Sequence, residues 1–314
     1  MKIREFYARL PLTYSFEVFP PKTDDEIRKL YDTIAELKAW GPRFVSVTSR
    51  PDRSQRDKTF QIAAHVKHNL GIESMAHLTC VAATEDQICQ DLDLARVLGL
   101  ENILALSGDP PKGSTQSVAG ERTLRYASQL VALIKQRSDF GIGVAGHPEG
   151  HSECPDKDKV LRDLQRKVDA GAEFVITQLF FDNDHFYDFV ERAQRLGIHV
   201  PIIPGILPIL STAQVKRFAA LSGATLPPSL ERDLKRLGND DAEVQKLGID
   251  YATQQCLDLL EQGVLGIHFY SLNRSASVKA IFKNLGPRWT IAQLTDNPSV
   301  SRSRGPDDPT LRDL

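Results

Sequence analysis

One carboxyl group in this sequence stands where apolar side chains dominate. Glu17 lies inside the apolar run Tyr14–Phe19, and Pro20-Pro21 ends that run directly after it. Apolar surroundings favour the protonated form of a carboxyl group, which suits it to act as a general acid near neutral pH. A structural carboxylate paired with Lys or Arg would occupy the same place, and position alone does not separate the two roles.

A second carboxyl group follows a short apolar run in a turn. Asp109 comes after Ser107-Gly108 and before Pro110-Pro111. A turn built from Gly and Pro can hold a carboxylate rigidly toward a ligand, although ordinary turn aspartates have the same neighbours.

The segment after residue 146 combines histidines with acidic residues. His147 and His151 have the four-residue spacing of a helical zinc site, but Pro148 and Gly150 between them oppose a regular helix. We therefore predict no metal site and expect a loop whose histidines bond phosphate or ribose oxygens. The string Gly141–Gly146 matches GxGxxG, but it reads as a strand and not as the turn that opens a dinucleotide-binding helix.

Eight short apolar runs position these polar residues. Their starts lie mostly about thirty residues apart, the length of a βαβ unit. Several runs are continuously apolar, as parallel strands covered on both faces are. The runs are Tyr14–Phe19, Arg43–Thr48, Ser74–Cys80, Asn102–Leu106, Ile142–Ala145, Glu173–Leu179, Val200–Ile206 and Leu265–Tyr270.

Amphipathic stretches between the runs have helical periodicity. Clear examples are Asp24–Trp40, Glu85–Leu98, Asp158–Ala170 and Asn183–Leu196. Eight strand–helix units predict an α/β fold of the (β/α)8 TIM-barrel type. An open doubly wound sheet is the alternative if one or two runs are not strands. Extra helices are expected between strands 7 and 8, at Thr212–Ser222, Pro228–Leu237 and Asp241–Gln262.

The barrel prediction gives the domain boundaries and the face that carries the chemistry. We expect residues 1–296 to form a single catalytic domain and the polar, Pro-rich residues 297–314 to form a disordered tail. Barrel enzymes carry their chemistry at the C-terminal ends of the strands. The polar residues at those ends are Glu17, Thr48, His77, Thr79, Asp109, His147, Glu149, Gln178 and Tyr270 to Arg274.

Composition excludes several classes of protein. Lys and Arg total 39 and Asp and Glu total 41, a net charge of −2, so we expect neither a nucleic-acid nor an acidic-membrane partner. The four cysteines form no CxxC pair, which indicates a reducing compartment. Since no signal peptide or membrane-spanning run is evident, we expect a cytoplasmic protein.

Seven segments between about Tyr14 and Leu285 resemble the methylenetetrahydrofolate reductase family of bacterial type, limited to its catalytic barrel, and they occur in the family's order. They are Ser15-Phe-Glu-Val-Phe-Pro-Pro-Lys-Thr23, His77-Leu-Thr-Cys80, Leu106-Ser-Gly-Asp-Pro110, Lys167-Val-Asp-Ala-Gly-Ala172, Ile176-Thr-Gln-Leu-Phe-Phe-Asp182, Pro204-Gly-Ile-Leu-Pro208 and Ile267-His-Phe-Tyr-Ser-Leu-Asn-Arg274.

The resemblance implies a barrel that binds FAD without a covalent bond. NAD(P)H would reduce the flavin and leave, and 5,10-methylenetetrahydrofolate would then bind on the same face. Hydride transfer from reduced FAD would give 5-methyltetrahydrofolate, the methyl donor for methionine synthesis. The resemblance also implies a homo-oligomer, a dimer or tetramer, and it leaves the choice between NADH and NADPH open.

The resemblance assigns roles to individual residues. Glu17 would protonate N10 and open the five-membered ring, and Asp109 would lie near flavin N1 and bond the pterin. Gln178, Tyr270 and Arg274 would orient the folate. The FAD site would be lined by Thr48, His77, Leu106, Gly108, Asp109, Tyr126, Ala127, His147, His151, Arg166 and Lys167, with Arg166 and Lys167 near the phosphates.

Some positions depart from the family's pattern. They are the segment Ser49–Arg53, Ser107, His147, Val160 and Thr212. These departures affect the cofactor pocket more than the acid, so a flavin-free reductase with direct hydride transfer stays an alternative. A folate-binding protein without catalysis and a metal-dependent barrel hydrolase are further alternatives.

Overall fold

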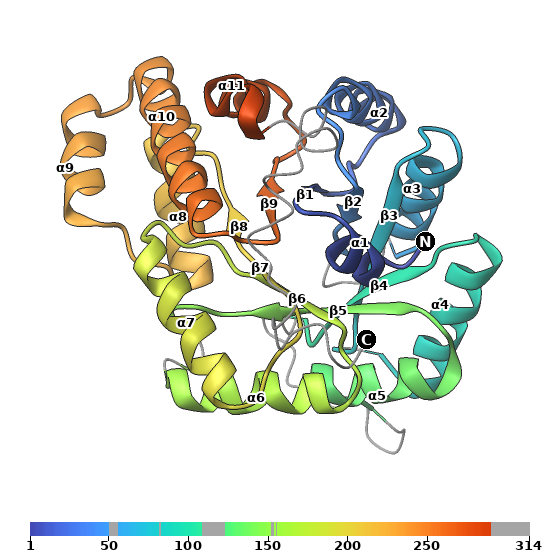
Figure 1. The fold of residues 1–314 in the computed structure, drawn as a ribbon. Helices are drawn as coiled ribbons and strands as arrows, with labels where there is room; N and C mark the ends of the chain where they lie inside the picture. The colour runs from blue at the N-terminus through green and yellow to red at the C-terminus, as the bar shows by residue number, and fades with distance from the viewer. Residues whose placement is uncertain (50–55, 82, 109–122, 152–153, 155, 290–314) are drawn as a thin grey trace.

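The computed structural model describes residues 1–49, 56–81, 83–108, 123–151, 154 and 156–289. Within these residues the strands pair only in parallel, in the order β7-β6-β5-β4-β3-β2-β1-β9-β8 (Figure 1). The strands are β1 (Thr13–Val18), β2 (Phe44–Val47), β3 (Glu73–Thr79), β4 (Asn102–Leu106), β5 (Gly141–Gly146), β6 (Phe174–Thr177), β7 (Ile202–Ile203), β8 (Gly205–Ile206) and β9 (Gly266–Tyr270).

The two end strands of that order are halves of one predicted run. β7 pairs with β6, β8 pairs with β9, and only Pro204 separates the halves. Proline has no N–H to give to a ladder, but its carbonyl oxygen accepts a 2.9 Å hydrogen bond from the His268 amide. The sheet therefore closes on itself, which confirms the (β/α)8 barrel over the open doubly wound sheet.

Helices cover the outside of the barrel (Figure 1). They are α2 (Asp24–Lys38), α3 (Arg56–His68), α4 (Glu85–Val97), α5 (Ala127–Arg137), α6 (Lys157–Asp169), α7 (Asn183–Arg195), α8 (Thr212–Ser222), α9 (Pro228–Leu237), α10 (Asp241–Glu261) and α11 (Ala276–Leu285). A further helix, α1 (Ile3–Arg9), lies at one end of the barrel. The three extra helices predicted between strands 7 and 8 are confirmed as α8, α9 and α10, which lie together on one side of the barrel.

Local sequence starts two of these helices through capping boxes. Thr23 accepts from the Glu26 amide while the Glu26 carboxylate accepts from the Thr23 amide, and Thr84 and Gln87 do the same before α4. Each box satisfies two donors that a helix start otherwise leaves unpaired.

Strand alternation divides the apolar side chains between two faces. Val18 packs with residues of the outer helices, and the Phe16 ring meets the edge of Phe282 on α11 at 6.0 Å. Because Phe16 and Val18 face the helices, Glu17 between them faces the barrel interior, as the alternation predicts.

The N-terminal helix, which the sequence analysis did not predict, lies against the N-terminal ends of the strands. Ile3 and Tyr7 are buried with Phe44 and Phe174, the first residues of β2 and β6. The Ile3 amide donates a 2.8 Å hydrogen bond to the Asn102 side chain at the start of β4. α1 therefore closes this end of the barrel.

Two expectations lie outside the described residues, namely the disordered tail at 297–314 and the position of Asp109. Among the described helices, none has the length and apolar character that crossing a membrane requires.

Candidate active site

Glu17 lies at the C-terminal end of β1 between two histidines. Its Oε2 atom is 3.4 Å from Nε2 of His77 on β3 and 3.6 Å from Nε2 of His268 on β9. The Glu17 side chain is 19% exposed, whereas His77 is nearly buried and His268 is completely buried. Among the described residues, no Lys or Arg forms an ion pair with Glu17. The structural alternative of a Lys- or Arg-paired carboxylate is therefore absent from the described part.

Each of the two histidines has a serine partner in the barrel interior. Ser46 Oγ is 2.7 Å from His77 Nε2, and Ser15 Oγ is 2.7 Å from His268 Nδ1. Ser15 and Ser46 are both buried. Each serine holds one nitrogen of its imidazole ring, and both rings lie within 3.6 Å of the Glu17 carboxyl group.

Burial keeps two neighbours of Glu17, His77 and Tyr270, uncharged at neutral pH. It lowers the pKa of His77 to about 4, although the nearby Glu17 opposes this shift. Burial also raises the pKa of the Tyr270 phenol well above its usual value, and Glu17 adds to this rise. Desolvation disfavours the charged form of both groups, so His77 and Tyr270 are neutral polar neighbours of the Glu17 carboxyl group.

The three residues expected to orient folate lie on two neighbouring parts of the barrel mouth. The Tyr270 hydroxyl donates a 2.6 Å hydrogen bond to the Thr177 carbonyl at the end of β6, next to Gln178. Gln178 is half-buried, and its backbone N–H donates a 2.7 Å hydrogen bond to the Gly146 carbonyl. Arg274 is exposed in the loop that follows β9. The barrel thus joins Tyr270 and Gln178 at one place, with Arg274 beyond them.

Five of the residues expected to line an FAD site lie at or after the ends of β2 and β4. Thr48 is half-buried after β2, and its amide donates to the Val18 carbonyl at 2.9 Å. Leu106 is the last residue of β4, and Gly108 follows with φ +82°. A Cβ on Gly108 would lie 2.6 Å from Val81, so only glycine fits there. Tyr126, 64% exposed, and the buried Ala127 begin α5.

The two histidines that follow β5 form a pair whose inner nitrogen is unsatisfied. The rings of His147 and His151 meet edge to face at 4.9 Å. Nδ1 of His147 is buried and has no hydrogen-bond partner among the described residues. Burial lowers the pKa of His147 to about 3, and the nearby Lys167 and His151 lower it further.

The two adjacent cations of α6 point in different directions. Lys167 donates a 2.9 Å hydrogen bond to the Ala145 carbonyl of β5, and burial lowers its pKa to about 8. Arg166 instead pairs with Asp163 at 2.7 Å, with its side chain 69% exposed. The structure therefore brings Lys167 to the end of β5 near His147 and leaves Arg166 on the outer face of the helix.

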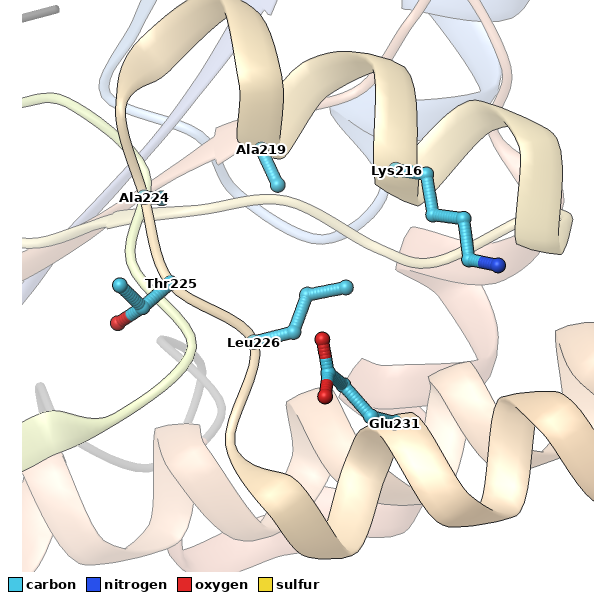
Figure 2. Close-up of a pocket in the computed structure, with 6 residues that line it drawn as sticks. All are labelled: Lys216, Ala219, Ala224, Thr225, Leu226 and Glu231. Atoms are coloured by element: carbon cyan, nitrogen blue, oxygen red, sulfur yellow. The ribbon is translucent and has the colours of Figure 1, made fainter.

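Glu149 ties the loop after β5 to two other elements. Its Oε2 accepts from the Thr225 amide at 3.0 Å and from the Thr225 hydroxyl, and it lies 3.2 Å from His185 Nε2 on α7. Thr225 also lines an open pocket of about 450 Å³ between α8 and α9 (Figure 2). None of the residues that the resemblance assigns to folate or FAD lines this pocket, which is formed by Lys216, Ala219, Ala224, Thr225, Leu226 and Glu231.

The departures from the family's pattern have structural partners where they are described. The Ser107 carbonyl accepts from the Val81 amide at 2.8 Å. Val160 is buried on the inner face of α6, and the Thr212 hydroxyl donates to the Gly238 carbonyl at 2.8 Å. Residues 50–53 of the departing segment lie outside the described residues.

Sequence reasoning did not assign a role to His268, Ser15 or Ser46. A usable signal was present, because Ser15 and Glu17 share one face of β1, and His268 and Tyr270 share one face of β9. A polar residue two positions before a strand-end candidate points to the same interior.

Comparison with known proteins places the chain in a family. The family model described as methylenetetrahydrofolate reductase matches residues 2–286. The chain belongs to the methylenetetrahydrofolate reductase family. The resemblance described from the sequence motifs is thereby confirmed. A 5,10-methylenetetrahydrofolate reductase of Escherichia coli is 40% identical over 281 residues, covering 88% of this chain and 92% of the relative.

Two other relatives in the methylenetetrahydrofolate reductase family are longer than this chain. Methylenetetrahydrofolate reductase (NADH) 1 of Arabidopsis thaliana is 36% identical over 313 residues, covering 96% of this chain and 52% of the relative. Methylenetetrahydrofolate reductase 1 of Schizosaccharomyces pombe is 38% identical over 278 residues, covering 88% and 46%. The chain therefore spans about half the length of these two relatives.

A solved structure supports the barrel fold. An uncharacterised protein from Clostridium thermocellum that binds two copies of 5-methyl-5,6,7,8-tetrahydrofolic acid superposes with a TM-score of 0.61. It is 16% identical and covers 90% of this chain and 96% of its own. At this identity the likeness concerns the fold alone.

Proposed function

We propose that this chain reduces 5,10-methylenetetrahydrofolate to 5-methyltetrahydrofolate, using NAD(P)H as the reductant and FAD as a bound cofactor. The observation that carries the proposal is the position of Glu17, a partly exposed carboxyl group at the barrel mouth whose described neighbours are the neutral His77 and the buried His268. Membership in the methylenetetrahydrofolate reductase family supports the choice of substrate.

Residues near β5 fit a cofactor that carries phosphates and hydroxyl groups. The buried Nδ1 of His147 lacks a partner among the described residues, and Lys167 brings an ammonium group to the same strand end. Thr48, His77 and His151 would complete the polar contacts, with Tyr126 and Ala127 beside them. FAD bound there would supply the hydride that NAD(P)H provides.

The protein's own residues would then prepare the folate. Gln178 and Tyr270 would hold the pterin, with Arg274 toward the exposed part of the molecule. Glu17 would deliver a proton to N10, because a protonated N10 is the better leaving group when the C–N10 bond breaks. The bond electrons go to N10, and the carbon left on N5 becomes electrophilic. His77 stays neutral and so does not compete as a proton donor.

Separate half-reactions test this proposal. The purified protein should be yellow, lose its colour with NADH or NADPH without oxygen, and regain it when methylenetetrahydrofolate is added. Glu17→Gln should keep the first step and slow the second at least about a hundredfold, the lower range for loss of a general acid. Glu243→Gln, which removes an exposed carboxylate of α10, should change neither step.

Three outcomes would contradict the proposal. Normal folate reduction by Glu17→Gln would exclude the acid role. A colourless protein that stays active after complete flavin removal would show direct hydride transfer from the nicotinamide. Tight folate binding without turnover under any reductant would indicate a binding protein.

A further inference from the structure

His268 is a buried polar neighbour of Glu17 whose function the proposed reaction leaves open. It is completely buried on β9, where the register places it beside Ser15 of β1. Its Nε2 atom has no hydrogen-bond partner among the described residues. The Glu17 Oε2 atom lies 3.6 Å from this nitrogen, which is just beyond hydrogen-bond distance.

The serine partners make the two histidines unequal. Ser15 Oγ contacts Nδ1 of His268, whereas Ser46 Oγ contacts Nε2 of His77. Since neither serine hydroxyl has another acceptor among the described residues, we assign each hydroxyl as the donor to its imidazole. Ser46 then occupies the lone pair of His77 on the side of Glu17, while Ser15 leaves Nε2 of His268 to carry the proton.

We propose that His268, fixed by Ser15 as the Nε2–H tautomer, is a positioning residue that stabilises the Glu17 carboxylate formed when Glu17 gives its proton to the substrate. This inference rests on the proposed function, because it concerns the same proton transfer. The Nε2–H donor of His268 is preorganised, and among the described residues the Glu17 carboxylate is the acceptor within its reach. The contact therefore shortens to a hydrogen bond as negative charge develops on Glu17, and hydrogen bonds to charged acceptors are the stronger ones.

The other groups that face His268 do not take over this role. Tyr270 meets it edge to face at 5.4 Å, and its phenol donates to the Thr177 carbonyl. Phe44 stacks on it at 6.1 Å. His77, the remaining titratable neighbour, stays neutral, since burial lowers its pKa to about 4. Of the described groups around His268, Glu17 is therefore the one whose charge changes during the reaction.

Two variants of equal polarity separate a donor at Nε2 from a donor at Nδ1. The amide nitrogen of His268→Gln falls near the Nε2 position, and that of His268→Asn falls near the Nδ1 position. The folate half-reaction is measured against pH in the full-length flavin-loaded protein, with reduction by NAD(P)H as the internal control. A general acid loses activity as rising pH removes its proton.

Loss of the donor should change both the height and the position of this pH profile. A carboxylate without its donor is less stable, so His268→Asn should lower the plateau about tenfold and move the falling limb about one pH unit upward. His268→Gln should stay close to the wild type in both respects. A uniform loss in both variants with no shift of the limb would overturn the proposal, because a purely structural histidine behaves in that way.

A spectroscopic measurement tests the tautomer without any turnover. In ¹⁵N-histidine-labelled protein, His268 should show a protonated Nε2 and an unprotonated Nδ1, and Ser15→Ala should weaken this preference. An unprotonated Nε2 in the wild type would refute the proposal even if folate is reduced. If the wild type reduces no folate but shows the expected tautomer, the proposed function fails and the orientation of His268 stands.

Discussion

The phenol of Tyr270 donates a 2.6 Å hydrogen bond to the Thr177 carbonyl across the position of Gly205. A Cβ on Gly205 would lie 2.4 Å from the Thr177 oxygen and 2.8 Å from the Tyr270 hydroxyl. The Gly205 amide also donates to the Thr177 hydroxyl at 3.0 Å. The absence of a side chain at Gly205 therefore lets β8 pass close to Tyr270, a residue expected to hold folate.

Gly205→Ala should damage both stability and folate affinity. The new methyl group would meet backbone, which cannot move aside as a flexible side chain can, so we expect a loss of about 3 kcal/mol in the free energy of unfolding. The KM for folate should rise because Tyr270 is displaced. Urea unfolding and steady-state kinetics measure these effects. Gly197→Ala places its methyl group in open space at φ +79° and should cost only about 1 kcal/mol; equal costs would contradict the close-approach argument.

Lys167 and Arg166 should contribute unequally to flavin binding. Lys167 reaches the end of β5, while Arg166 pairs with Asp163 on the outer face of α6. Lys167→Met should weaken the affinity for FAD about tenfold, the size expected for one charged hydrogen bond. Arg166→Met is the matched control and should change the affinity less than about twofold. Fluorescence titration of the apoprotein with FAD measures both, and the reverse order would refute this arrangement.

His77 should make the protein sensitive to acid. Its folded pKa of about 4 lies below the usual value of 6.5, so the unfolded chain binds the proton more readily. Stability is therefore complete above pH 6.5 and is lost as the pH falls toward 4. Between pH 7.5 and 5.0 the wild type should lose about 2 kcal/mol more than His77→Asn in urea unfolding. Equal losses in the two proteins would exclude a buried neutral His77.

Glu149 should hold together the loop after β5, the loop before α9 and the start of α7. Its side chain is 7% exposed and bonds to Thr225 and His185, so Glu149→Gln should lower the free energy of unfolding by about 1–3 kcal/mol. Hydrogen exchange at the Thr225 amide should quicken. Asp233→Asn, which breaks an exposed pair with Arg236 on α9, should cost less than about 0.5 kcal/mol. If Glu149→Gln lowers the free energy of unfolding no more than Asp233→Asn does, Glu149 does not link these elements.

Much of the barrel was predictable because its strands and helices are specified by patterns of neighbouring residues. The alternation of Phe16, Glu17 and Val18 was enough to direct Glu17 inward, and the ends of β4, α8 and α9 agree with the predicted runs. Helical periodicity separates Lys167 from Arg166 in a similar way, since Lys167 lies three residues after the buried Leu164 on α6. The sequence pattern therefore distinguishes the two cations, although the resemblance implies phosphate contacts for both.

Other features depended on contacts between distant parts of the chain. The Ser15–His268 pair joins residues 253 positions apart, and only the register of β1 against β9 brings them together. The seven residues of α1 have little helix-forming signal of their own, because their stability comes from packing Ile3 and Tyr7 against the strand ends. The break at Pro204 likewise depends on distant strands, because β7 pairs with β6 before it and β8 pairs with β9 after it.

The position of α1 also affects the order in which molecules can reach Glu17. Since Ile3 and Tyr7 fill one end of the cylinder together with Phe44 and Phe174, the described residues leave the opposite rim as the approach to the carboxyl group. An electron donor and an electron acceptor that occupied the same part of this rim would have to bind in turn. The two proposed half-reactions would then follow a ping-pong sequence.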